Sequence, residues 1–279
     1  MQVAAPQVAP VAPAPRRSVK SYLIGGVVGL IVGALVMLSL SLTGVIGHGG
    51  ASTMQEGPGY DSPEAAAFAF LDGLKAGDLD AMLAPFAIQS FAANCDYEAR
   101  LVQTQSPSSS DYTSCPYPND DPLGAAANVR ARIASLSGQI SMMIFTLVSP
   151  NLASLQGNVS LRIPDDTAAQ AFVQKIAQDF ANYPFKDLSN RQSVDPASLW
   201  DKYASDLNQQ NIAAIAQIYG LTRADYADVA ITFDAGGQQW VYAPSAGRYH
   251  GRWYLLMPQG NLAPALELSY VDFGLGHLH

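Results

Sequence analysis

Apolar residues recur at helical spacing directly after residue 60. One apolar face is made of four residues spaced i, i+3, i+4 and i+7, namely Ala67, Phe70, Leu71 and Leu74. Ser62 and Pro63 form a favourable helix start, and Gly77 can end the helix in the left-handed conformation. Asp78 then caps a second apolar face, which holds Leu79, Met82, Leu83 and Phe86. The stretch 61–86 therefore predicts two short helices that share one core.

Further helices and then strands are predicted along the rest of the chain. Helical patterns cover residues 122–136, 166–182 and 196–220. The apolar run 139–148 and the alternating run 158–163 are interpreted as strands. The last part is predicted to hold two strands around Gly236-Gly237 within 228–244, a third at 247–258 and a fourth at 264–273. Helices followed by antiparallel strands with short turns indicate an α+β fold.

Residues 22–46 form a long apolar run without a charged residue. As a helix they would span roughly 37 Å, which is enough to cross an apolar bilayer core of about 30 Å. The basic residues Arg16, Arg17 and Lys20 precede the run, and basic residues favour the cytoplasmic side. We therefore predict a single transmembrane helix with a cytoplasmic N-terminus and an extracytoplasmic C-terminal domain in the cell membrane.

The predicted organisation follows from this helix. It comprises a disordered Pro/Ala-rich cytoplasmic tail (1–21), the transmembrane helix (22–46), a flexible linker (47–60), an exported domain (61–273) with a helical insertion (165–220), and a C-terminal tail (274–279). Small residues at Gly49 and Ala51 also suit signal peptidase cleavage. The apolar run is, however, longer than the roughly 7–15 residues of a signal sequence. An uncleaved signal-anchor is the preferred interpretation.

Three glycines at a spacing of four lie within the predicted transmembrane helix. Gly25, Gly29 and Gly33 would share one face, where a second helix can approach closely. This pattern predicts a homodimer through the membrane helix. Glycine is also common in transmembrane helices without such a role.

The only two cysteines, Cys95 and Cys115, both fall in the exported part. An even pair outside the cytoplasm favours a disulfide, which would close a loop rich in Ser, Pro and Asp. No motif around either residue indicates a catalytic thiol, and two Cys with four scattered His do not suggest zinc. We predict a structural disulfide.

The charge of the exported part restricts its partners. Without the three basic residues before the membrane helix, 12 Lys and Arg remain against 23 Asp and Glu, a net charge of −11. An acidic surface argues against nucleic acid and against docking on anionic lipid. The predicted partners are the bilayer that holds the anchor and either a small apolar ligand or an envelope protein.

No catalytic motif is present in the sequence. There is no nucleophile elbow, phosphate loop, dinucleotide motif or H-E-x-x-H. Aromatic residues gather near the end and would line a ligand cavity or simply fill the core; with His250 these are Trp240, Tyr242, Trp253 and Tyr254. His250 could act as a general base, although a structural or solvent-facing role is the simpler interpretation. No cofactor and no metal are predicted, and His277 and His279 with Asp272 offer only a weak metal set.

The two ends of the exported part resemble a known family. "SPEAAAFAFLDGLKAGDLDAMLAPF" and "VAITFDAGGQQWVYAPSAGRYHGRWYLL" are similar to the opening helices and closing hairpins of the nuclear transport factor two superfamily. The family includes ketosteroid isomerase and scytalone dehydratase. The resemblance implies helices packed on a curved, mainly antiparallel sheet with an apolar cavity. It places no catalytic residue on this chain, because the fold hosts enzymes and binding proteins alike.

Three functions stay open at this point. The preferred one is a membrane-anchored extracytoplasmic binding module without catalytic activity. The alternative is a small-molecule isomerase, dehydratase or hydrolase that uses a cavity carboxylate or His250. A structural envelope protein is the third.

Overall fold

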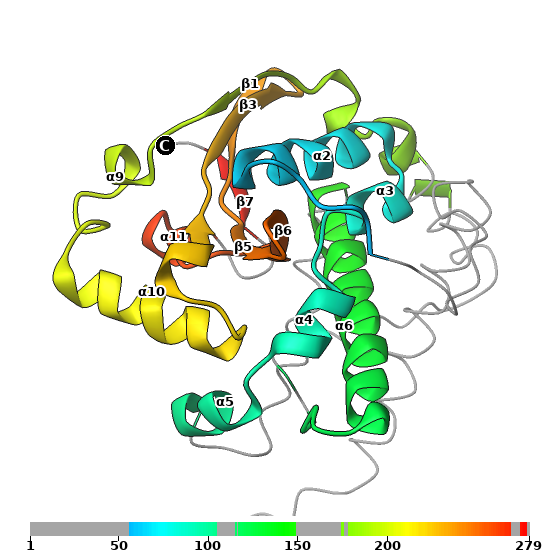
Figure 1. Cartoon of the computed structure of the whole chain (residues 1–279). Coiled ribbons are helices and arrows are strands. Elements are labelled where there is room, and N and C mark those ends of the chain that lie inside the picture. The colour runs from blue at the N-terminus through cyan, green and yellow to red at the C-terminus, as the bar shows by residue number, and fades with distance from the viewer. Residues whose placement is uncertain are drawn as a thin grey trace, which may run out of the picture.

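The computed structural model describes residues 56–104, 115, 117–148, 174–175, 178–268 and 274–277. The helices are α2 (Pro63–Ala76), α3 (Leu79–Leu83), α4 (Gln89–Asn94), α5 (Tyr97–Thr104), α6 (Pro122–Val148), α9 (Pro196–Leu199), α10 (Asp206–Ile218) and α11 (Leu262–Ala265), with short 3-10 helices η1 (Pro184–Asp187) and η2 (Arg223–Asp225). Most strands follow the helices (Figure 1). The described part is a mixed α+β fold, as predicted.

The opening helices form as the sequence predicts. The Ser62 side chain accepts a hydrogen bond from the Ala65 amide at the start of α2, and Gly77 ends that helix with φ 66°. The Asp78 side chain accepts from the Ala81 amide and so caps α3. Helix α3 is shorter than the predicted apolar face, because it ends at Leu83 and Phe86 follows it.

Helix α6 corrects one strand prediction. The helix that begins at Pro122 continues through 139–148, which we predicted to be a strand. Ile140, Met143 and Ile144 recur at helical spacing and are buried against α2 and α3. The periodicity of a short apolar run does not distinguish a buried strand from a buried helix. The strand prediction for residues 139–148 was wrong for this reason.

The strands form two sheets where one curved sheet was expected. The four-stranded sheet has the order β1 (Ser189–Ser193), β3 (Ile231–Ala235), β4 (Gln238–Tyr242), β7 (Leu275–His277). The three-stranded sheet has the order β2 (Tyr226–Asp228), β5 (Ser245–Tyr249), β6 (Arg252–Met257). All named strand pairs in the described part are antiparallel.

The hairpin signal at Gly236-Gly237 is confirmed. Both glycines have positive φ, and they join β3 to β4. The predicted third strand, 247–258, is instead a second hairpin. His250 and Gly251, also with positive φ, turn the chain between β5 and β6.

Several predicted boundaries also change. The predicted helix over 196–220 is two helices, because Ser205 begins α10 with its own side-chain cap. Strand β1 lies inside the predicted helical insertion and pairs with β3. Helix α11 occupies the start of the predicted strand 264–273, and β7 lies in the predicted tail. Of the predicted helix 166–182, residues 174, 175 and 178–181 are described and helical, and the predicted strand 158–163 lies outside the described residues.

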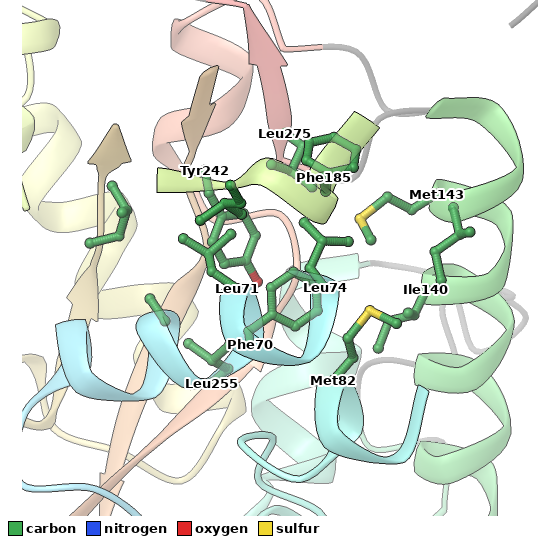
Figure 2. Packing of buried hydrophobic residues seen from close by; sticks show 14 of the residues in the cluster. Phe70, Leu71, Leu74, Met82, Ile140, Met143, Phe185, Tyr242, Leu255 and Leu275 are labelled. Atoms are coloured by element: carbon green, nitrogen blue, oxygen red, sulfur yellow. The ribbon is translucent and has the colours of Figure 1, made fainter. Parts of the chain in front are cut away.

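The largest core lies between the opening helices, α6 and the four-stranded sheet. Figure 2 shows side chains from α2, α3, α6, β4 and β6 converging on one interior. Phe70 stacks on Tyr242 and meets the edge of Phe86. A second core joins α4 and α10 to the three-stranded sheet and includes the cysteine pair.

The residues just before α2 are part of the domain rather than a flexible linker. Tyr60 and Trp253 exchange two backbone hydrogen bonds of 2.9 Å, which add a bridge to the outer edge of β6. The Glu56 carboxylate accepts from the amides of Ile88 and Ser90, at 2.6 and 2.8 Å. It thereby caps α4, which has no side-chain cap of its own. We call residues 56–61 the clamp segment; it comprises the last five residues of the predicted linker 47–60 and the first residue of the predicted domain.

Candidate functional site

Asp228 is the only buried carboxylate among the described residues, with 6% of its surface exposed. It ends β2 and lies opposite Ser245 of β5. Burial raises the pKa of Asp228 to about 6, although bonds from Asn261 lower that pKa in part. A carboxylate kept in such surroundings destabilises the fold when it is charged, which makes this position a candidate site.

The two oxygens of Asp228 differ in their surroundings. Oδ1 accepts a hydrogen bond from the backbone amide of Asn261 at 3.1 Å and one from the Tyr226 hydroxyl at 3.4 Å. Oδ2 is buried and accepts no hydrogen bond from the described residues. The site therefore has one oxygen that is fixed in place and one that can accept a further donor.

A chain of hydrogen bonds extends from Asp228 to helix α10. Asn261 Nδ2 donates to Asn208 Oδ1 at 3.0 Å, and Asn208 Nδ2 donates to the Tyr203 carbonyl at 2.7 Å. Gln209 donates to the same carbonyl and accepts from Arg223. These bonds hold the start of α10, the end of β2 and the segment before α11 in one arrangement.

Two tyrosines contribute hydroxyl groups to the site. Burial raises the pKa of Tyr203, and the charge of Asp228 raises it further. Burial also raises the pKa of Tyr226 well above its ordinary value, again with a contribution from Asp228. Both tyrosines are therefore neutral at physiological pH. The pKa values of all three titrating groups are therefore shifted in favour of their neutral forms.

The structure does not bring the five predicted cavity residues together. Trp240 and Tyr242 lie on β4, where they are buried in the largest core. Trp240 packs edge-on against Phe185 and lies beside His277 of β7, with ring centroids 3.9 Å apart. Trp240 and Tyr242 are therefore core residues of the four-stranded sheet.

The other three predicted residues belong to the second hairpin. Trp253 and Tyr254 are neighbours on β6 and belong to different cores on its two faces. His250 is exposed in the turn between β5 and β6, with φ 52°. No buried acid faces His250 there, because the one buried carboxylate of the described part is Asp228. His250 is therefore poorly placed as a general base.

Sequence reasoning missed Asp228 because the residue stands at the start of a strand pattern. We interpreted "DVAITFDAGGQQWVYAP" as two strands around Gly236-Gly237 and assigned Asp228 no separate role. The sequence signal that could have indicated the burial of Asp228 was the alternation of buried and exposed positions along a strand. Asp228 and Tyr226 are two residues apart, so they face the same side of β2, and Tyr226 is buried.

The cysteine prediction is confirmed. Cys95 and Cys115 form a disulfide, and both residues are buried. Asn128 of α6 donates to the Tyr117 carbonyl beside them at 3.0 Å and so links the disulfide to α6.

Two further predictions concern residues at the edges of the described part. No three described His, Cys, Asp or Glu side chains are placed to hold a metal ion. His279 and Asp272 lie outside the described residues, as do the segment 22–46 and its glycines Gly25, Gly29 and Gly33.

One described helix, α6, is long and apolar enough to cross a membrane by length and composition. Its Arg132 is fully buried and donates to the carbonyls of Ala87 and Leu256. These contacts join α6 to the second core, so we describe it as a core helix.

Comparison with known proteins yields one fold likeness. No protein-family model matches the chain, and no curated protein matches it. A solved cystatin-like protein from Ruminococcus gnavus ATCC 29149 is similar in structure, with a TM-score of 0.40 and 13% sequence identity. The likeness covers 81% of this chain and 41% of that protein, so the chain spans about two fifths of its length.

Proposed function

We propose that the chain is a single-pass membrane protein whose exported domain binds a ligand or partner without catalysing a reaction. The uncharged run 22–46 after a basic cluster supports the anchor. The disulfide between Cys95 and Cys115 supports an extracytoplasmic domain, because such bonds persist in oxidising compartments. We also retain the relation to the nuclear transport factor two superfamily as a proposal, which the two-sheet α+β fold supports only in outline.

The observation that favours binding over catalysis is that Asp228 has, among the described groups around it, no partner whose pKa is brought near neutral pH. Proton transfer between two neighbouring groups is efficient when the pKa values of both donor and acceptor lie near the working pH. Here burial raises the pKa of Asp228, Tyr203 and Tyr226 alike. Such a group suits recognition of a donor by the free Oδ2 oxygen.

The two alternatives have less support. Catalysis through His250 would use a residue that is exposed in a hairpin turn. A purely structural envelope protein would gain more stability from an apolar residue at position 228, because a buried charge is costly. The presence of Asp228 in the interior is therefore better explained by binding of a ligand or partner than by a purely structural role.

Ligand screening on the full chain in lipid nanodiscs tests the proposal. Water-soluble amines, amides and alcohols would be screened at pH 7.5 for an increase in thermal stability of the wild type. We expect a binder to stabilise the wild type and the control Asp201→Asn, whose site is exposed, but not Asp228→Asn.

Mass spectrometry of the same mixtures separates binding from catalysis. The binder should be recovered unchanged after incubation with the wild type. Conversion of a compound by the wild type and not by Asp228→Asn would replace the binding proposal with the enzymatic alternative. Equal stabilisation of the wild type and of Asp228→Asn would show that Asp228 is not part of the binding site.

A further inference from the structure

The start of helix α10 is held on the domain mainly by polar contacts. Of its first six residues, 206–211, only Asn208 is buried, and Leu207 is 70% exposed. The first buried apolar side chain is Ile212, at the end of the second turn. A segment with few buried apolar contacts opens locally at a low cost in free energy. The hydrogen bonds at this end of α10 therefore decide whether it stays in place.

These hydrogen bonds lead from α10 to Asp228. Asn208 Oδ1 accepts from Asn261 Nδ2 at 3.0 Å, and the Asn261 amide donates to Asp228 Oδ1 at 3.1 Å. The segment around Asn261 is fixed by a core of its own, because Leu262 and Ala263 directly after it are buried. Strand β2 is fixed by its pairing with β5. Of these three connected elements, the start of α10 is therefore held least firmly.

The groups around Asp228 do little to stabilise its charged form. Among the described residues, the titratable groups that face it are Tyr226 of β2 and Tyr203 before α10. The charge of Arg223 of η2 also acts on the carboxylate, but the Arg223 guanidinium donates to Gln209. No described cation forms an ion pair with Asp228. The other neighbouring elements contribute neutral side chains, namely Ser245 of β5, Asn261 before α11 and Asn208 of α10.

Ionisation of Asp228 therefore leaves a poorly compensated charge in the interior. Its Oδ2 oxygen is buried and accepts no hydrogen bond from the described residues. Water can relieve this charge only where a covering segment moves away. Helix α10 contacts β2, and in Figure 1 it lies with α9 on one outer side of the molecule, so its start can move away without opening the largest core.

We propose that Asp228 is a pH-dependent switch whose protonated form keeps the start of α10 closed against β2 and whose ionised form releases that segment, so that water reaches Oδ2. Burial raises the pKa of Asp228 to about 6, so the carboxyl is mainly protonated at pH 5 and mainly ionised at pH 7.5. Opening restores the ordinary pKa of 3.8, and ionisation therefore favours the open form. The switch is a property of the described fold and depends neither on the ligand nor on the membrane anchor proposed above.

Hydrogen exchange of the full chain, followed by mass spectrometry, tests the switch. The amides of residues 208–211 are compared at pH 5.0 and pH 7.5 after correction for the intrinsic rate of exchange. We expect local opening to be about tenfold more frequent at pH 7.5, which follows from pKa values of 3.8 in the open form and about 6 in the closed form. The increase should be absent from Asp228→Asn and preserved in the control Asp201→Asn, whose site is exposed.

Low concentrations of urea separate local opening from unfolding of the whole domain. Exchange through local opening responds weakly to urea because little surface becomes exposed, whereas exchange through global unfolding responds strongly. We expect the amides of residues 208–211 to exchange faster than those of β3 and β4 and to respond less to urea. An equal urea response in the two regions would overturn the switch, as would protection at residues 208–211 that does not change with pH.

Tyr226→Phe provides a second test that keeps the buried ring. The Tyr226 hydroxyl donates to Asp228 Oδ1 at 3.4 Å and lowers the pKa of Asp228. Without this bond the pKa should rise, so the increase in exchange at residues 208–211 should continue to a higher pH before it levels off. A substitution that only loosened the packing would raise exchange at every pH without this displacement. An unchanged pH dependence in Tyr226→Phe would contradict the proposal even if Asp228→Asn fails to fold.

Discussion

The ring of Phe70 on α2 stacks on the ring of Tyr242 on β4, with centroids 4.7 Å apart and planes inclined by 21°. This pair joins the opening helix to the closing sheet, although more than 170 positions separate the two residues in the sequence. Figure 2 shows both side chains within the largest core. The Tyr242 hydroxyl is buried there and has no hydrogen-bond partner among the described residues.

Tyr242→Phe should therefore stabilise the domain. The substitution keeps the stacked ring and removes a hydroxyl that has lost its bonds to water. We expect the free energy of unfolding to rise by about 1 kcal/mol. Urea denaturation of the full chain in nanodiscs measures it. Phe70→Ala is the matched contrast and should cost about 3–5 kcal/mol, because it removes the partner ring and leaves a cavity. A loss of stability in Tyr242→Phe would show that the hydroxyl is bonded.

Asp228→Asn should change the pH dependence of stability. The folded pKa of about 6 lies above the unfolded value of 3.8, so folding favours the protonated acid. Its stabilising contribution is fully present below about pH 4 and is lost as the pH rises through 6. The difference corresponds to about 3 kcal/mol at pH 7.5. We expect the variant to lack this decline between pH 4 and 6.5.

Thermal denaturation of the wild type and Asp228→Asn across this pH range tests the prediction. The variant should be the more stable protein at pH 7.5 and lose that advantage near pH 4. Parallel curves for the two proteins would contradict the pKa shift of Asp228. Asp201→Asn, at an exposed position, serves as the control and should follow the wild type.

Glu56→Ala should weaken the start of α4. The carboxylate of Glu56 accepts from two backbone amides that have no other side-chain cap. Loss of such a cap costs about 1–2 kcal/mol. Glu98→Ala, which changes an exposed acid in the first turn of α5, should cost only a few tenths of a kcal/mol. Hydrogen exchange should accelerate at Ile88 and Ser90 in the Glu56 variant and stay unchanged there in the control.

Replacement of both cysteines by alanine should lower the free energy of unfolding more than Glu56→Ala or Glu98→Ala does. The disulfide links residues 20 positions apart, which corresponds to about 3 kcal/mol in the chain-entropy model. Both residues are buried, so alanine leaves an apolar position without an exposed thiol. A comparison of melting temperatures, with and without reductant, measures the effect. Reductant should lower the melting temperature of the wild type and leave that of the variant unchanged.

The local signals in this sequence predicted local structure well. The Ser62 and Asp78 caps and the left-handed glycine at Gly77 depend on residues within four positions, and all three form as expected. The Gly236-Gly237 turn is equally local. The disulfide could be predicted because only two cysteines exist.

Elements whose identity depends on distant partners were predicted less well. The run 139–148 is helical because its apolar residues meet α2 and α3, which no pattern within the run reveals. Strand β7 is only three residues long and exists through its pairing with β4. The clamp segment has the composition of a spacer and is ordered by contacts with α4 and β6.

The sequence by itself determined the capped opening helices, the first hairpin, the cysteine pairing and the α+β class. The tertiary structure decided the candidate site, because the burial of Asp228 depends on Asn261, 33 positions away, and on α10. It also decided that the five predicted aromatic and histidine positions are divided between two sheets and a turn. Caps and turns are set by neighbouring residues, whereas burial is set by whichever segments pack against a residue in space.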